Sequence, residues 1–217
     1  ISEAEKLGKL FEIEAKLKAA SAQITDIEIV GFNEVESEQH LHNSFGLKLS
    51  TKQNYYYFHT SVVAKDGEDV KTSYKVFLDN DFSKFDVDKF VQDVAHDVLK
   101  KLGGKPTATK AYPVVFSPRM TSSLLAAYLS SASADRVEKK TSLFADKLNE
   151  RVASSKVTVL DAPLTRNIFY RYFDDEGVAK TNKPIIKNGI LQTFLHNLST
   201  STKMGVAPTG HRRITGG

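Results

Sequence analysis

The sequence contains no cysteine, no tryptophan and two methionines among its 217 residues. Without cysteine the chain forms no disulfide, thiol nucleophile or cysteine metal site. This composition is typical of a reducing compartment, and we expect a cytoplasmic protein. No apolar run approaches the roughly 18 residues of a membrane span, and no basic-then-apolar leader opens the sequence. We therefore expect neither a membrane protein nor a secreted one.

The sequence also lacks a strong charge of one sign. Its formal net charge is +4, and its lysines and arginines are spread along the whole length instead of forming a basic patch. Such a diffuse charge gives no footprint for nucleic acid, which is not an expected partner. Hydrophobic residues at 41% and charged residues at 26% describe an ordinary globular protein.

The length and the ends indicate how the chain is organised. At 217 residues it can form one large or two modest domains. Ile1 is not an initiator methionine, and residues 214–217 follow directly after a motif, so we expect an internal piece of a longer protein. We place an α+β domain at residues 1–105 and a β-rich domain with helices at residues 106–217.

The first half predicts two helices and an antiparallel sheet. Ser2 is a good cap for one helix, whose apolar residues at helical spacing are Leu7, Leu10, Phe11, Ile13 and Leu17. Asp86 caps a second helix, which is expected to cover the sheet and to stop at Gly103-Gly104. Turn-prone residues divide the stretch between them into four or five strands; the turns are expected at Gly31 to Asn33, Asn43-Ser44, Gln53-Asn54 and Asp66-Gly67. The fold class is therefore α+β, with an antiparallel sheet and covering helices.

The second half is expected to be β-rich, with two helices inserted early. Tyr112 to Phe116 predicts a short buried strand, after which Ser117-Pro118 begins a helix. Leu143 to Val152 predicts another helix. Further strands are expected at residues 156–160 and 168–173 and in a hairpin around Asn188-Gly189, the dipeptide that supplies both positive-φ residues of a type I′ turn.

An acidic triplet, Asp174-Asp175-Glu176, precedes this hairpin. Three consecutive carboxylates repel one another, so they are either fully solvated or face cations, backbone N–H groups or a partner. His196 and His211 flank the same region, and His211 directly follows Thr209-Gly210. A polar cleft lined by these residues is one hypothesis, and a purely structural turn is the other.

Other polar residues give weaker signals. Arg212-Arg213 could bind a peptide carboxylate or could simply be solvated. His40 and His42 project from one face of a predicted strand, but nothing local completes a zinc site. The sequence contains no HExxH helix, no GxSxG elbow and no phosphate loop, so it carries no specific signal of catalysis.

Taken together, five stretches resemble the TldD/PmbA family, known as modulators of DNA gyrase and as peptide-maturation metalloproteases. They are Tyr112 to Pro118 with Ser122 to Leu125, Thr141 to Leu148, Phe173 to Val178, Asn188 to Leu195, and Met204-Gly205 with Pro208 to Gly210. Members of the TldD branch carry an HExxxH motif in this region, whose histidines bind zinc and whose glutamate activates a water molecule. Alignment through Thr141 to Ala145 places Leu125 and Ser130 at the histidine positions and Ala126 at the glutamate position.

The resemblance therefore implies no metal site and no catalytic residue in this chain, and it assigns the chain to the PmbA (TldE) branch. It implies a non-catalytic or substrate-handling subunit that pairs with a TldD-type zinc peptidase subunit, acts on peptides or unfolded segments, and leaves zinc to that partner. Residues expected at a cleft or partner contact are Asp174, Asp175, Glu176, His196, Thr209, His211 and Arg212. Two alternatives stay open: a nucleic-acid or gyrase-associated regulator, and a homodimeric binding module without an enzyme partner.

Overall fold

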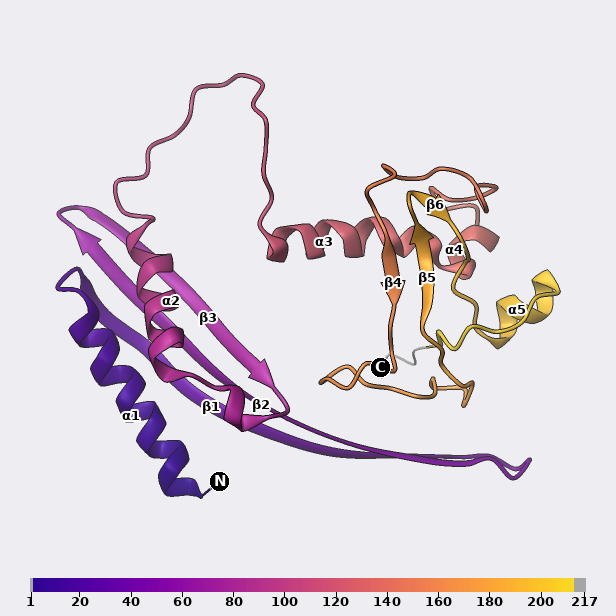
Figure 1. The fold of residues 1–217 in the computed structure, drawn as a ribbon, viewed down its shortest axis with the longest axis horizontal. Helices are drawn as coiled ribbons and strands as arrows, with labels where there is room; N and C mark the ends of the chain where they lie inside the picture. The colour runs from indigo at the N-terminus through magenta and orange to yellow at the C-terminus, as the bar shows by residue number, and fades with distance from the viewer. Residues whose placement is uncertain (1, 213–217) are drawn as a thin grey trace. The chain divides into compact units, whose positions relative to one another are not determined.

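A computed structural model describes residues 2–212, so the expectations for Ile1, Arg213 and residues 214–217 lie outside the described range. The chain forms two compact units, which are described separately (Figure 1). One unit comprises Ile1–Glu38 and Lys52–Lys110, and the other comprises Gln39–Thr51 and Ala111–Gly217. The second unit is therefore built from two separate stretches of sequence.

The first unit contains a three-stranded sheet and two helices. Its elements in chain order are α1 (Glu3–Ala20), β1 (Ile24–His42), β2 (Lys48–Asp66), β3 (Asp69–Asp79), a 3₁₀ turn (Phe82–Lys84) and α2 (Val87–Leu99). The strand order is β1-β2-β3, and β2 pairs antiparallel with β3. Both predicted helix caps are confirmed, since the Ser2 side chain accepts from the N–H of Glu5 and Asp86 accepts from that of Lys89. The predicted α+β class is confirmed.

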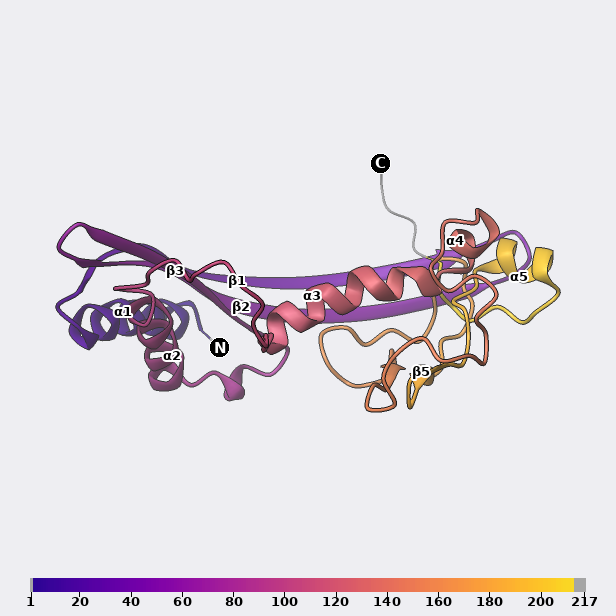
Figure 2. The ribbon, with the colours of Figure 1, turned by 90° about the horizontal axis from the view of Figure 1, so that it is seen from above.

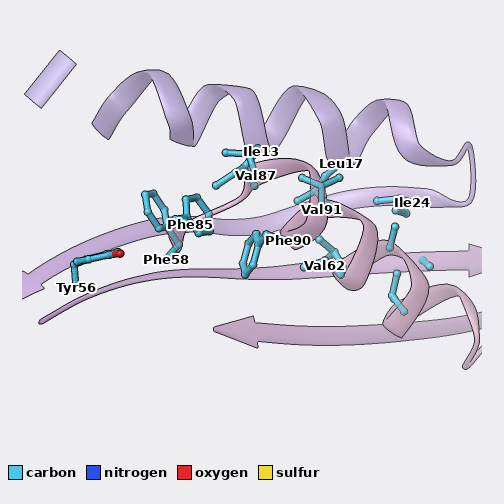
Figure 3. Packing of buried hydrophobic residues seen from close by; sticks show 14 residues of the cluster. Ile13, Leu17, Ile24, Tyr56, Phe58, Val62, Phe85, Val87, Phe90 and Val91 are labelled. Carbon is cyan, nitrogen blue, oxygen red and sulfur yellow. The ribbon is translucent and has the colours of Figure 1, made fainter. Parts of the chain in front are cut away.

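Both helices pack on the same face of the sheet (Figure 3). Alternate residues of β2 are buried on that face, namely Tyr56, Phe58, Thr60, Val62 and Ala64. The rings of Phe58 and Phe85 stack at a centroid distance of 3.9 Å, and α1 and α2 contribute fully buried aliphatic side chains. Apolar burial and aromatic stacking therefore hold the helices to the sheet.

Two of the four turns predicted in this region do not exist. β1 runs without interruption through Gly31 to Asn33, and β2 runs through Gln53-Asn54, so three long strands replace the predicted meander of four or five. Gly31 serves close packing instead of a turn. A Cβ atom there would lie 2.2 Å from Cε1 of His59, whose ring occupies the space above the glycine.

The second unit contains a small antiparallel sheet and three helices. The elements are α3 (Pro118–Leu129), a 3₁₀ turn (Ser130–Ala132), α4 (Ala134–Glu138), β4 (Val159–Asp161), β5 (Lys183–Lys187), β6 (Ile190–Leu191) and α5 (Leu198–Met204). The strand order is β4-β5-β6. Figure 2 shows α3 along its length, leading into α4. The hairpin is confirmed, because φ is 51° at Asn188 and 80° at Gly189, as a type I′ turn requires.

Several predicted elements of this unit are wrong. Tyr112 to Phe116 is not a buried strand, since Val115 is 96% exposed and its neighbours are also exposed. Leu143 to Val152 forms turns instead of a helix, because Asp146 and Asn149 take positive φ values of 60° and 65°. Residues 168–173 form no strand beyond an isolated bridge between Phe173 and Ala179, and the strand expected at residues 156–160 is the shorter β4.

Across residues 2–212, the structure contains no helix that is both long and apolar enough to cross a lipid bilayer.

Replacement of Phe58 by alanine should strongly destabilise the first unit. The substitution removes the ring stacked on Phe85 and leaves a cavity in the core, so we expect the free energy of unfolding to fall by about 3–5 kcal/mol. Urea denaturation followed by circular dichroism measures the change. Phe45, which is 95% exposed, supplies the control, since Phe45→Ala should change stability by about 0.5 kcal/mol or less. Equal effects of the two substitutions would contradict this description of the core.

Candidate functional site

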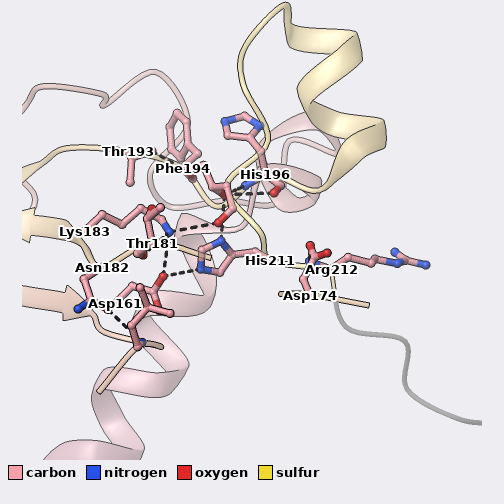
Figure 4. A network of polar contacts seen from close by, with 12 residues as sticks. Asp161, Asp174, Thr181, Asn182, Lys183, Thr193, Phe194, His196, His211 and Arg212 are labelled. Carbon is pink, nitrogen blue, oxygen red and sulfur yellow. Dashed lines mark hydrogen bonds and ion pairs between the residues drawn. The ribbon is translucent and has the colours of Figure 1, made fainter. Parts of the chain in front are cut away.

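The polar residues predicted from the sequence lie close together in the second unit (Figure 4). There the segment after α5 meets three other parts of the chain: the acidic turn, the end of β4 and the start of β5. We call residues 207–212 the closing segment. It carries Thr209, His211 and Arg212, and each of these residues forms a hydrogen bond with another part of the second unit. The structure therefore brings together most of the residues that the sequence indicated.

Asp174 is the buried centre of the acidic turn, with no exposed surface. Its Oδ1 atom accepts from the backbone N–H groups of Glu176, at 3.0 Å, and of Val178, at 2.9 Å. Its Oδ2 atom accepts from the N–H of Arg212, at 2.9 Å. Gly177 completes the turn at φ 80°, a conformation that favours glycine. The carboxylate thus holds its own turn and the closing segment together.

The other two acids of the triplet also have partners. Asp175 forms an ion pair with Arg171, whose guanidinium also donates to Oε1 of Gln39 at 3.0 Å. Glu176 accepts at 2.8 Å from the N–H of Leu198, the first residue of α5. Of the two interpretations left open by the sequence, the structure selects the one in which the carboxylates face cations and backbone N–H groups.

The acidic turn also packs against the tip of the β1–β2 hairpin, which belongs to the same unit. The Tyr172 hydroxyl donates to the carbonyl oxygen of Ser50. A Cβ atom at Gly177 would lie 2.4 Å from a methyl carbon of Leu47, so this glycine is also required for close packing. The tip therefore helps to position the turn.

A second cluster joins Asp161, Lys183, His211, Thr209 and His196. Oδ2 of Asp161 lies 2.9 Å from Nε2 of His211 and 3.0 Å from Nζ of Lys183. Nδ1 of His211 lies 2.9 Å from Oγ1 of Thr209. The ammonium of Lys183 also donates to the carbonyl oxygen of Thr209, at 3.1 Å. A continuous chain of hydrogen bonds therefore runs from the end of β4 to the closing segment.

Burial and charge shift the pKa values of this cluster. Burial by itself would raise the pKa of Asp161, but the hydrogen bonds and charges of His211 and Lys183 outweigh it and hold the pKa below its ordinary value. Burial, and next the charge of His211, lower the pKa of His196. Burial also lowers the pKa of Lys180, whose Cγ would lie 3.1 Å from a Cβ atom at Gly210.

His196 is 6% exposed, and its Nδ1 atom is buried without a hydrogen-bond partner. Its ring lies 6.4 Å from that of Phe194. Its backbone, not its ring, contacts Thr209: the N–H donates to Oγ1 of Thr209 at 2.6 Å, and the carbonyl oxygen accepts from the Thr209 N–H at 3.1 Å. Thr209 therefore links the backbone of His196 to the ring of His211.

The helix that would carry a zinc motif does not offer ligands at the relevant positions. Leu125 and Ala126 have no ligating atom, and the Ser130 hydroxyl donates to the carbonyl oxygen of Ala127 at 2.7 Å. Among residues 2–212, the structure has no group of three or more histidine, cysteine or acidic side chains arranged to hold a metal ion. The rings of His40 and His42 lie 6.3 Å apart, without such a group around them. The side chains of α3 therefore do not fit a zinc ion.

Sequence reasoning missed four residues of the site: Asp161, Arg171, Lys180 and Lys183. Each lies in a stretch with ordinary strand or turn composition, and none belongs to a spaced motif. Only the fold brings Asp161 next to His211, which lies 50 residues further along the chain.

Comparison with known proteins defines the class. A family model for the PmbA/TldA metallopeptidase central domain matches residues 1–102, and the model for the C-terminal domain of the same family matches residues 109–217. The chain therefore belongs to the PmbA/TldD family of metallopeptidase-related proteins.

Three relatives illustrate the match. The metalloprotease PmbA of Escherichia coli O157:H7 is 25% identical over 206 residues, which are 92% of this chain and 46% of the relative. A protein of Thermotoga maritima, described as a candidate modulator of a DNA gyrase, has a solved structure with a TM-score of 0.91 and 25% identity over 100% of this chain and 50% of its own. TldE of Thermococcus kodakarensis shares the fold, with a TM-score of 0.71 and 21% identity over 94% of this chain and 47% of its own. The chain thus spans about half the length of these proteins.

Asp174→Ala should destabilise the second unit strongly. The change leaves the N–H groups of Glu176, Val178 and Arg212 without their acceptor, so we expect the free energy of unfolding to fall by roughly 2–5 kcal/mol. Asp174→Asn keeps one acceptor oxygen and should cost less. Chemical denaturation measures both changes, with the exposed Glu150→Gln as control. A loss below about 0.5 kcal/mol for Asp174→Ala would show that the turn does not depend on this carboxylate.

Asp161→Asn should weaken the dependence of stability on acid pH. A carboxyl group with a lowered pKa in the folded state stabilises the fold at neutral pH, and this contribution is lost as the pH falls through the folded pKa. The free energy of unfolding should therefore fall less steeply toward acid pH in the variant than in the unmodified protein. Denaturant titrations at a series of pH values measure the two slopes. Parallel slopes would rule out a depressed pKa at Asp161.

Proposed function

We propose that this chain is a PmbA/TldE-type subunit of a two-subunit zinc metallopeptidase that cuts peptides or unfolded segments. In this proposal the zinc ion and the catalytic groups belong to a TldD-type partner, and this chain contributes substrate handling and partner contacts. The observation that carries the proposal is the composition of α3 and the 3₁₀ turn that follows it, where Leu125, Ala126 and Ser130 stand at the positions of the family's HExxxH motif. Two apolar side chains and a hydroxyl cannot hold zinc or activate water.

The candidate site supports the same conclusion from another direction. A general base needs a carboxylate or an imidazole with a free acceptor that faces the substrate. Asp174 accepts three backbone hydrogen bonds, Asp175 pairs with Arg171, and Asp161 pairs with Lys183 and His211. These carboxylates already have structural partners, which favours a structural role for the site over a hydrolytic one.

The family supplies the remainder of the proposal. The metallopeptidase descriptions of the matching domains and the metalloprotease name of the Escherichia coli relative support a role in peptide cleavage. A subunit that keeps the fold but lacks ligands at the motif helix fits a complex in which one member carries the metal. A role in peptide maturation follows if the complex cuts a precursor peptide.

Reconstitution with a TldD-type zinc subunit tests the proposal. We expect the chain alone to leave casein and short peptides intact, with or without added zinc, and the mixture to cleave them until a chelator is added. Zinc content, measured by elemental mass spectrometry on each separated subunit, should follow the partner. A partner whose HExxxH glutamate is replaced by glutamine is the matched control and should abolish cleavage. Chelator-sensitive cleavage by this chain alone would overturn the proposal, and so would zinc bound to it.

A further inference from the structure

The Thr209 hydroxyl has three hydrogen-bond partners, and it can serve all three only when two of them are donors and one is an acceptor. Its Oγ1 atom lies 2.6 Å from the N–H of His196, 3.1 Å from the carbonyl oxygen of His196 and 2.9 Å from Nδ1 of His211. A threonine hydroxyl has one hydrogen to donate and two lone pairs that accept. Which of the three contacts are made therefore depends on whether Nδ1 of His211 carries a hydrogen.

With neutral His211, only two of the three contacts can form. The carboxylate of Asp161 faces Nε2, so the neutral ring carries its hydrogen there and presents a lone pair at Nδ1. Nδ1 and the carbonyl oxygen of His196 then compete for the single hydroxyl hydrogen of Thr209. One of these two acceptors therefore receives no hydrogen from the Thr209 hydroxyl. The hydroxyl oxygen itself accepts only from the N–H of His196.

With protonated His211, all three contacts form together. Nδ1 becomes a donor to Oγ1 of Thr209, which also accepts from the N–H of His196 and so uses both lone pairs. The hydroxyl hydrogen is then free to bond the carbonyl oxygen of His196. The imidazolium also forms a charge-assisted pair with Asp161, which is stronger than the neutral bond.

We propose that Thr209 and His211 form a proton-operated latch: protonation of His211 turns the Thr209 hydroxyl toward the His196 carbonyl and fastens the closing segment to the backbone of His196. Two further hydrogen bonds hold the closing segment on either side of Gly210 and His211. Lys183 donates to the carbonyl oxygen of Thr209, and Asp174 accepts from the N–H of Arg212 at the end of the segment. A stronger hydrogen bond at Thr209 is therefore expected to reduce the opening of the whole closing segment, residues 207–212.

Three charged or titratable groups lie around His211: Asp161 at the end of β4, Lys183 at the start of β5, and His196 before α5. Lys180, which interacts with Asp161, is a further nearby cation. The pKa of Asp161 lies below its ordinary value, since the hydrogen bonds and charges of His211 and Lys183 outweigh its burial, so this carboxylate is ionised at neutral pH.

Solution NMR of the chain across the titration of His211 tests the latch. We expect the carbonyl carbon of His196 to shift downfield with the same midpoint as the His211 ring, because it gains a hydrogen bond. Amide exchange at Arg212, corrected for the intrinsic effect of pH, should slow by about threefold to tenfold over that range, as expected for one additional hydrogen bond. The carbonyl of Leu195, which accepts from the N–H of Ala134, serves as internal reference.

Three variants separate the latch from general pH effects. Thr209→Val removes the hydroxyl and should abolish the His196 carbonyl shift, whereas Thr209→Ser should keep it. His211→Gln removes the titration and should leave amide exchange at Arg212 independent of pH after correction. His42→Gln, which replaces an exposed side chain at the end of β1, should change nothing. If Thr209→Val does not fold, the serine and glutamine variants still decide the question. A carbonyl shift that persists in His211→Gln, or is absent in the unmodified protein while His211 titrates, would overturn the proposal.

Discussion

The buried carboxylate of Asp174 is the interaction on which the site depends. Removing a carboxylate from water costs several kcal/mol unless hydrogen bonds replace the lost hydration. Here three backbone N–H groups replace it, two from the turn itself and one from Arg212. Because a single side chain closes the turn and also anchors the closing segment, the positions of Asp175, Glu176 and His211 all follow from it. The acidity of the triplet is thus an architectural requirement of this unit.

The sequence predicts the parts of the fold that local rules control. Ser2 and Asp86 cap helices, and Asn188-Gly189 forms the hairpin, because each depends on a few neighbouring residues. The failures are places where the local pattern does not determine the structure. A turn is expected at Gly31, but this residue lies under the ring of His59 inside a long strand. The apolar run before α3, Tyr112 to Phe116, has the composition of a buried strand but is exposed. Asp146 and Asn149 interrupt a helical pattern with positive φ values that composition does not reveal.

The candidate site shows the same division. Its acidic turn, Thr209 and His211 are identifiable because they stand next to glycine or proline in dense motifs, and His196 because it follows the apolar arm of the hairpin. Asp161 and Lys183 were not, because their role arises only when β4 and β5 pair and bring them to the closing segment. Whether a carboxylate is solvated or faces cations and backbone N–H groups also depends on the partners that the fold brings to it. For the acidic triplet those partners are backbone groups and Arg171, and neither kind can be assigned from sequence spacing.

The split make-up of the second unit has a consequence for how the molecule is built in time. Residues 39–51 are synthesised some sixty residues before Ala111, yet they supply Gln39, Leu47 and Ser50 to the packing around the acidic turn. Contacts of such high sequence separation form late and slow folding. During translation the hairpin tip therefore lacks these contacts, and stays exposed, until the chain has been extended past Gly177. A fragment that begins at Ala111 would be deprived of these contacts, so the two units cannot be separated by a single cut in the polypeptide.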